Sequence, residues 1–155
     1  MFRVTADSLE DYFDFDPKRK SDLQQLDRLI RKAAPKLKRY FHRGTPAGQP
    51  GMRMKMIGYG LMHHALKSGA TLEWPAIGVA LQKNYTSVYF SVMAGNAPVV
   101  AGYAGKLGEL RSGDNNFSFL RFDDLNVDAL SSLIREAARI YEADPENSLR
   151  DKKRQ

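Results

Sequence analysis

The sequence predicts a single α+β domain, an antiparallel sheet packed on one face by N- and C-terminal helices. Two observations carry this prediction. The middle of the chain alternates apolar with small or polar residues, as half-buried strands do, and an amphipathic helical pattern stands on each side of it. Because the strands are bunched together, the order favours an α+β fold over a parallel sheet. A length of 155 residues suits one domain with its own core.

The chain is expected to begin with a short helix. Asp7 is placed to cap a helix that begins at Ser8, and Glu10 would complete a capping box. Leu9, with the aromatic residues that follow it, gives this turn a small apolar surface. We place the start of the domain at residue 7.

A longer amphipathic helix is expected next. Asp16 and Pro17 form a strong start signal, because proline is favoured at the first helical position. Pro35 should kink or restart the helix, which ends near Arg43. Its basic residues lie on the face opposite the apolar stripe, so the helix should lie on a sheet or on another helix. The stripe comprises Leu23, Leu26, Ile30, Ala33 and Leu37.

The predicted sheet has its centre in a hairpin at residues 75–92. The strand Pro75–Gln82 and the strand Ser87–Val92 alternate strictly, and a short polar loop, Lys83–Thr86, joins them. Two more strands, Met52–Gly58 and Leu61–Leu66, are expected before it. The buried face of the hairpin comprises Ile77, Val79, Leu81, Val88, Phe90 and Val92.

The opposite face of this hairpin consists of small residues with one tyrosine. Gly78, Ala80 and Ser91 lie there with Tyr89 among them. Such a face either lets another element pack closely or floors a shallow pocket. Close packing is the simpler interpretation.

The last part of the chain adds one strand and a final helix. Residues 113–116 predict a turn, and Phe117 and Phe119 mark a strand after it. Val99–Tyr103 fits a short helix or an irregular segment. Asn126 caps a helix from Val127 to about Tyr141, where we place the end of the domain. The charged tail, residues 146–155, is expected to be disordered.

Composition excludes several classes of function. There is no cysteine, so disulfides, thiolate nucleophiles and cysteine-based zinc sites are ruled out. The first residues lack the apolar run of a signal peptide, and no stretch is long enough to span a membrane. We therefore expect a cytoplasmic protein without a membrane partner. Neither a G-x-S-x-G motif nor a Walker A loop is present, so no catalytic site is predicted, although a pocket assembled from separate strands would leave no motif.

The net charge of +6 is concentrated in one segment. Residues 17–43 hold ten basic side chains against two acidic ones. The simpler interpretation is a solvated helix face, and the alternative is a nucleic-acid or phosphate-binding module. No aromatic platform or helix-turn-helix spacing accompanies the basic residues, so only weak, non-specific nucleic-acid contact is expected. The basic residues are Lys18, Arg19, Lys20, Arg28, Arg31, Lys32, Lys36, Lys38, Arg39 and Arg43.

The segment before it is acidic and offers a candidate metal site. Asp7, Glu10, Asp11 and Asp14 have helical spacings of three and four, which brings several of them close on one turn. Oxygen ligands suit hard cations, including weakly bound iron. The simpler interpretation is that acids in a first turn stabilise the helix N-terminus.

Tyrosines and lysines around the small-residue face form the second candidate site. We expect Tyr59, Lys83, Tyr85, Tyr89 and Lys106 to converge there, where they could hold an anion or a planar small molecule. Structural tyrosines and surface lysines are the simpler interpretation.

Several short segments resemble the YdhG-like family of small bacterial proteins, some of which are described as frataxin-like iron chaperones. The resemblance implies the same α+β fold and an intracellular iron-handling role, with iron as the ligand. Many members carry a cysteine in the strand that reads Asn116–Phe119 here, so thiol chemistry is not implied for this chain. The segments that carry the resemblance are Arg43–Pro46, Tyr59–Gly60, Ile77–Ala80, Lys83–Tyr85, Val88–Phe90, Lys106–Gly108, Gly113, Phe119–Phe122 and Asp124–Leu125.

Overall fold

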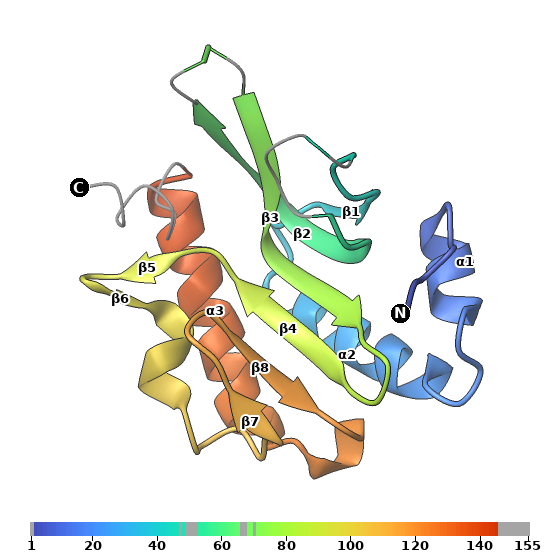
Figure 1. The fold of residues 1–155 in the computed structure, drawn as a ribbon. Helices are drawn as coiled ribbons and strands as arrows, with labels where there is room; N and C mark the ends of the chain where they lie inside the picture. Colours follow the sequence, from blue (N-terminus) through green and yellow to red (C-terminus); the bar gives the residue numbers. More distant parts are fainter. Residues whose placement is uncertain (1, 47, 49–52, 66–67, 70, 146–155) are drawn as a thin grey trace.

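The chain folds as one α+β domain in which a six-stranded antiparallel sheet is contacted by N- and C-terminal helices (Figure 1). The computed structural model describes residues 2–46, 48, 53–65, 68–69 and 71–145. The predicted tail, residues 146–155, lies outside the described residues. The elements in chain order are α1 (Leu9–Asp14), α2 (Lys20–Ala33), β1 (Arg39–His42), β2 (Met56–Ala65), β3 (Thr71–Leu81), β4 (Thr86–Phe90), β5 (Met93–Ala94), β6 (Ala97–Pro98), η1 (Val99–Tyr103), β7 (Arg111–Ser112), β8 (Asn116–Phe119), η2 (Phe122–Asp124) and α3 (Val127–Ala143).

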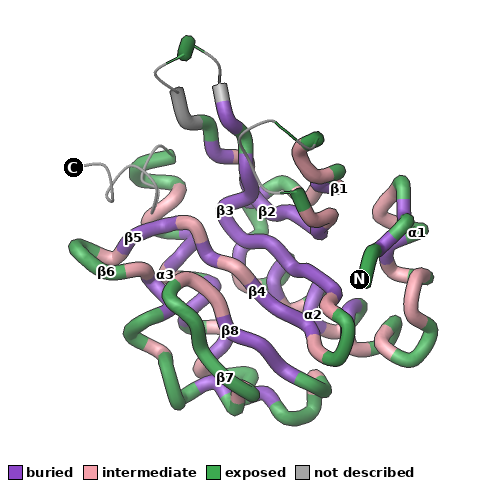
Figure 2. The backbone as a smooth tube through the Cα atoms, viewed as in Figure 1, coloured by how far each residue is buried: buried purple, intermediate pink, exposed green. Residues whose placement is uncertain are grey.

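The strands lie in the order β1-β2-β3-β4-β8-β7, with α2 and α3 behind the sheet in Figure 1. The pairing register puts one buried residue from each of four neighbouring strands into a single row: Ile57, Val79, Val88 and Phe117. Each of these side chains is at most 1% exposed. Figure 2 shows the same pattern, with the central strands buried and β7 exposed. The predicted apolar face of the hairpin is therefore confirmed.

The opposite face of the sheet is also closely packed near the hairpin. Gly78 and Ala80 are buried, and a Cβ atom on Gly78 would lie 2.9 Å from the Sδ atom of Met56. Ser91 is half-buried and donates a hydrogen bond of 2.9 Å to the carbonyl of Pro75. These contacts favour the interpretation of the small residues as spacers that permit close packing.

The N-terminal helix begins with a different cap from the one predicted. The Ser8 hydroxyl accepts the backbone N–H of Asp11 at 3.0 Å, so Ser8 is the N-cap and the expected capping by Asp7 is wrong. Serine has the short oxygen-bearing side chain that this position favours. Val4 and Ala6, just before the predicted domain start, are buried in the core.

The long basic segment does not form one helix, which corrects the prediction for residues 17–43. The Asp16 carboxylate accepts the backbone N–H of Lys18 at 3.0 Å, so a turn precedes α2. The helix then ends at Ala33, because a proline at position 35 disfavours helical geometry in the residue before it. Ala34 has φ −132° and ψ 65°, and the chain continues into β1.

The two strands predicted at residues 52–66 are one continuous strand. β2 runs from Met56 to Ala65, and residues 53–55 precede it without strand geometry. Gly60 has φ +75°, which glycine adopts without strain, so the strand passes through this position instead of ending there. Met52 and Leu66, at the ends of the predicted strands, lie outside the described residues.

The strand β3 begins four residues before its predicted start, whereas the strand and the helix predicted after the hairpin are confirmed to within two residues. Phe117 and Phe119 lie on β8, and residues 113–116 form the turn before it, with the Gly113 N–H bonded to the Asn116 carbonyl at 2.8 Å. Val99–Tyr103 is the short helix η1, which the sequence had left open. Asn126 caps α3 by accepting the Ala129 N–H at 3.1 Å. No helix among the described residues is long and apolar enough to cross a membrane.

Candidate anion-binding groove

The structure does not bring the five predicted ligand-binding residues to one face of the sheet. Tyr59 faces the helices and is 1% exposed. Tyr89 faces the other way, because its neighbours Val88 and Phe90 point into the core. Burial and the nearby Tyr85 raise the pKa of Tyr89 above its ordinary value, so those two tyrosines lie near each other.

The two predicted lysines lie in exposed connections. Lys83 is in the loop between β3 and β4, and Lys106 follows η1, where its N–H donates to the Tyr103 carbonyl at 2.9 Å. The thickness of the sheet separates Tyr59 from the Tyr85–Tyr89 pair. The sequence predicts that the five residues converge around the small-residue face, and in the structure they do not.

The four predicted metal ligands lie on and before α1. Asp14 forms an ion pair with Lys20 at 2.5 Å, and Asp7 one with Lys55 at 3.4 Å. Within the part of the chain that the structure describes, no three acidic or histidine side chains are grouped so that they could hold a metal ion. Binding of iron at Asp7, Glu10, Asp11 and Asp14 stays a prediction.

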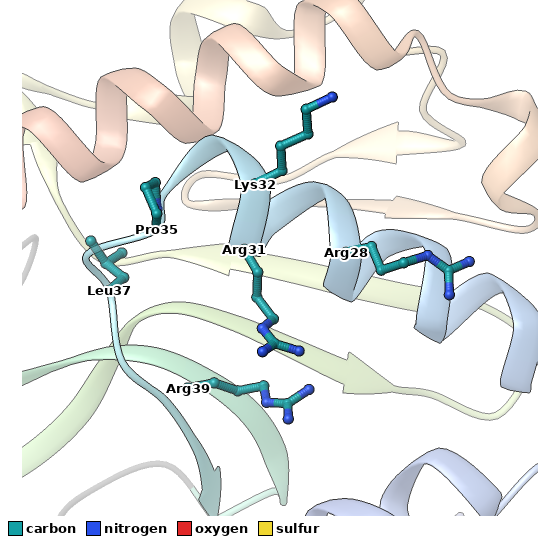
Figure 3. A pocket seen from close by; sticks show the side chains of 6 residues that line it. All are labelled: Arg28, Arg31, Lys32, Pro35, Leu37 and Arg39. Atoms are coloured by element: carbon teal, nitrogen blue, oxygen red, sulfur yellow. The ribbon is translucent and has the colours of Figure 1, made fainter.

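Basic side chains gather instead in a pocket of about 720 Å³ between α2 and the start of β1 (Figure 3). No carboxylate is among its described lining residues. In Figure 3, Arg31 extends from α2 toward Arg39, while Arg28 and Lys32 leave the helix in other directions. We call this cavity the basic pocket. Its lining residues are Arg28, Arg31, Lys32, Pro35, Leu37 and Arg39.

A buried carboxylate beside the basic pocket positions two of its arginines. Asp27, on α2, is 6% exposed and accepts hydrogen bonds from the Tyr59 hydroxyl at 2.6 Å and from Nη1 of Arg39 at 2.8 Å. Nη1 of Arg31 lies 3.5 Å from the same carboxylate. Burial, with the adjacent Asp27, holds the pKa of Tyr59 well above its ordinary value, so this hydroxyl keeps its proton and donates at neutral pH.

Local structure explains why Arg39 reaches the helix. Leu37 is buried and anchors the connection after Pro35, and the next residues enter β1. Arg39 pairs with Tyr59 on β2, so its side chain lies on the helix side of the sheet. The guanidinium also lies 6.0 Å from the ring centroid of Phe13, within the range of a cation–π contact. Arg39 is thus held between Asp27 and an aromatic ring.

A second pocket of about 590 Å³ adjoins the first and shares Arg28, Arg31 and Arg39 with it. It extends toward α1, whose exposed Glu10 and Asp14 contribute to its wall. We call this cavity the α1 pocket, and the two pockets together the groove. The other residues that line the α1 pocket are Leu9, Phe13, Lys20, Gln24 and Asp27.

The groove is suited to binding an anion. Each guanidinium presents a planar fork of donors that matches the oxygens of a phosphate or carboxylate. Five basic side chains and three carboxylates line the groove, and the acids lie in the α1 pocket. The basic pocket is therefore its electropositive end.

The sequence contained the members of this site but gave no sign of their arrangement. The sequence pattern predicts a solvated helix face for Arg28, Arg31 and Lys32, and it predicts Arg39 further along the same helix. The signal that could have separated Arg39 from the others is Pro35, four residues before it. Asp27 was counted only as one acid in a basic segment.

Comparisons with known proteins return no similarity. No family model matches the chain, and neither the curated proteins nor the solved structures include a match. The resemblance to the YdhG-like family, with the iron-handling role that it implies, stays a prediction.

Proposed function

We propose that this chain is a binding protein for a ligand that carries a phosphate group, and that the basic pocket holds this group. The observation that carries the proposal is that four basic side chains, from α2 and β1, line one cavity whose described lining contains no carboxylate. A monoanion or dianion placed there would be attracted by the four basic side chains of this lining.

Preorganisation supports the proposal. An exposed arginine loses side-chain entropy when it closes on a ligand, and this loss weakens binding. Here Asp27 and the ring of Phe13 already restrain the Arg39 guanidinium, with 30% of its side chain exposed. Arg39 keeps donors beyond the Nη1 bond to Asp27, because a guanidinium carries five N–H groups.

The test is a titration with inorganic phosphate at low ionic strength, followed by amide chemical shifts in ¹⁵N-labelled protein. The affected amides should cluster on α2 and β1. Changing both Arg28 and Arg31 to glutamine should raise the dissociation constant for phosphate at least about tenfold, since a hydrogen bond to a charged group contributes about 1.5–3 kcal/mol.

The control is Arg135→Gln, which removes one exposed arginine of α3 that does not line the groove. It lowers the net charge by one and should leave the dissociation constant within about twofold of wild type. Equal phosphate affinity in the wild type and the Arg28/Arg31 variant, or shifts confined to another face, would refute the proposal.

A further inference from the structure

The two ends of the groove differ in their carboxylates. The described lining of the basic pocket holds four cations and no carboxylate, whereas the α1 pocket adds Glu10, Asp14 and Asp27 to Lys20 and three of the same arginines. Asp14 is paired with Lys20 at 2.5 Å, but Glu10 makes no ion pair with any described residue. The α1 end therefore presents an exposed carboxylate that can accept hydrogen bonds.

An apolar surface lies beside these carboxylates. Leu9 and Phe13 line the α1 pocket, and both are half-buried. Their apolar atoms are suited to contact with the uncharged body of a ligand. Apolar walls with a few placed polar groups are typical of small-molecule sites.

We propose that the ligand is a small molecule with a phosphate at one end and N–H donors, from an amine or an amino-substituted ring, at the other. This inference rests on the proposed function, and it adds the chemistry of the end of the ligand opposite the phosphate. The phosphate lies in the basic pocket, and the N–H donors face Glu10 and Asp14. The body of the ligand lies against Leu9 and Phe13.

The same charge pattern argues against a nucleic-acid strand in the groove. A strand repeats its phosphates, so a backbone that continued from the basic pocket would place a second anion near Glu10, which makes no ion pair with any described residue. Like charges repel each other, and Asp11, also exposed, adds a further negative charge on α1. A ligand with a single anionic end avoids this cost.

The test compares four probes on the full chain by isothermal titration calorimetry. Adenosine monophosphate has an exocyclic amino group on its ring, where inosine monophosphate has a carbonyl oxygen and an N–H on the adjacent ring nitrogen. Phosphoethanolamine carries its amine on a flexible chain, and inorganic phosphate has no second end. Adenosine monophosphate should bind about tenfold more tightly than inosine monophosphate, or phosphoethanolamine about tenfold more tightly than inorganic phosphate, or both. The pair that shows this difference tells whether the groove prefers the amino-substituted ring or the flexible amine.

The decisive variant is Glu10→Gln with Asp14→Asn. In this protein the preference for the amino-bearing probe should fall to about twofold or less, while inorganic phosphate binds somewhat more tightly because repulsion is removed. Circular dichroism checks that the variant is folded. The two substitutions lie at exposed positions, where stability effects are usually small.

The outcomes separate the two proposals. Phosphate binding that depends on Arg28 and Arg31, without any preference for an amino-bearing probe, overturns this inference and leaves the proposed function standing. Tighter retention of a single-stranded RNA oligonucleotide than of all four probes also overturns it, in favour of nucleic acid. Absence of phosphate binding overturns both proposals.

Discussion

Replacing Tyr59 with phenylalanine removes one oxygen from the network that supports the groove. The lost hydrogen bond joins the Tyr59 hydroxyl to Oδ1 of Asp27 at 2.6 Å, and both residues are buried, with exposures of 1% and 6%. A hydrogen bond to a charged acceptor contributes about 1.5–3 kcal/mol, and it is strongest where water is excluded. We therefore expect Tyr59→Phe to lower the free energy of unfolding by about 1.5–3 kcal/mol.

A double-mutant cycle assigns this cost to the pair. Asp27→Ala leaves the Tyr59 hydroxyl buried without its acceptor and removes the ion pair to Arg39, so it should cost about 2–4 kcal/mol. In the double variant neither partner is left unpaired in the core. Its loss should therefore be at least about 1 kcal/mol smaller than the sum of the two single losses.

The assay is urea unfolding followed by circular dichroism, and the protein supplies its own control. Tyr103 donates to a carboxylate oxygen of Glu136 at 2.8 Å, but this pair lies near the surface. Tyr103→Phe should cost less than about 1 kcal/mol, because water replaces the lost bond. If Tyr59→Phe costs no more than Tyr103→Phe, or the cycle is additive within about 0.5 kcal/mol, the buried network does not contribute as we argue.

Three further predictions concern stability. Ala80→Leu should lower the free energy of unfolding, measured by denaturant, by about 1–3 kcal/mol through overpacking, because Ala80 is fully buried. A loss below about 0.5 kcal/mol would indicate an open cleft. Gly108→Ala should lower the melting temperature more than Gly105→Ala. Both glycines have positive φ, but only at Gly108 would the new Cβ meet a neighbour, the Asp124 carbonyl, and equal losses would contradict this reasoning. Burial raises the pKa of Tyr12 to about 12. The contribution of this residue to the free energy of unfolding is therefore complete below the unfolded pKa near 10 and is lost as the pH rises toward 12. Wild type should lose about 2–3 kcal/mol more than Tyr12→Phe between pH 9 and 12, and parallel curves would show that the Tyr12 pKa is not raised.

The sequence by itself determined the parts of the fold that depend on local periodicity. The hairpin alternates over enough residues that its large apolar side chains share one face, and Ile77, Val79, Val88 and Phe90 are at most 1% exposed as predicted. The cap of α3 was equally visible, because Asn126 needs only the backbone of the next turn. Such interactions lie within a few residues along the chain.

Tertiary structure alone decided the candidate site. The helical spacing of Leu37 agreed with α2 and so hid the change to a strand, which is stabilised by pairing of Arg39 with Tyr59, twenty residues away. That pairing also turned Tyr59 toward Asp27 and brought Arg39 beside Arg31. Because strand pairing and the burial of a carboxylate depend on residues distant in sequence, periodicity within a short window could not reveal the groove.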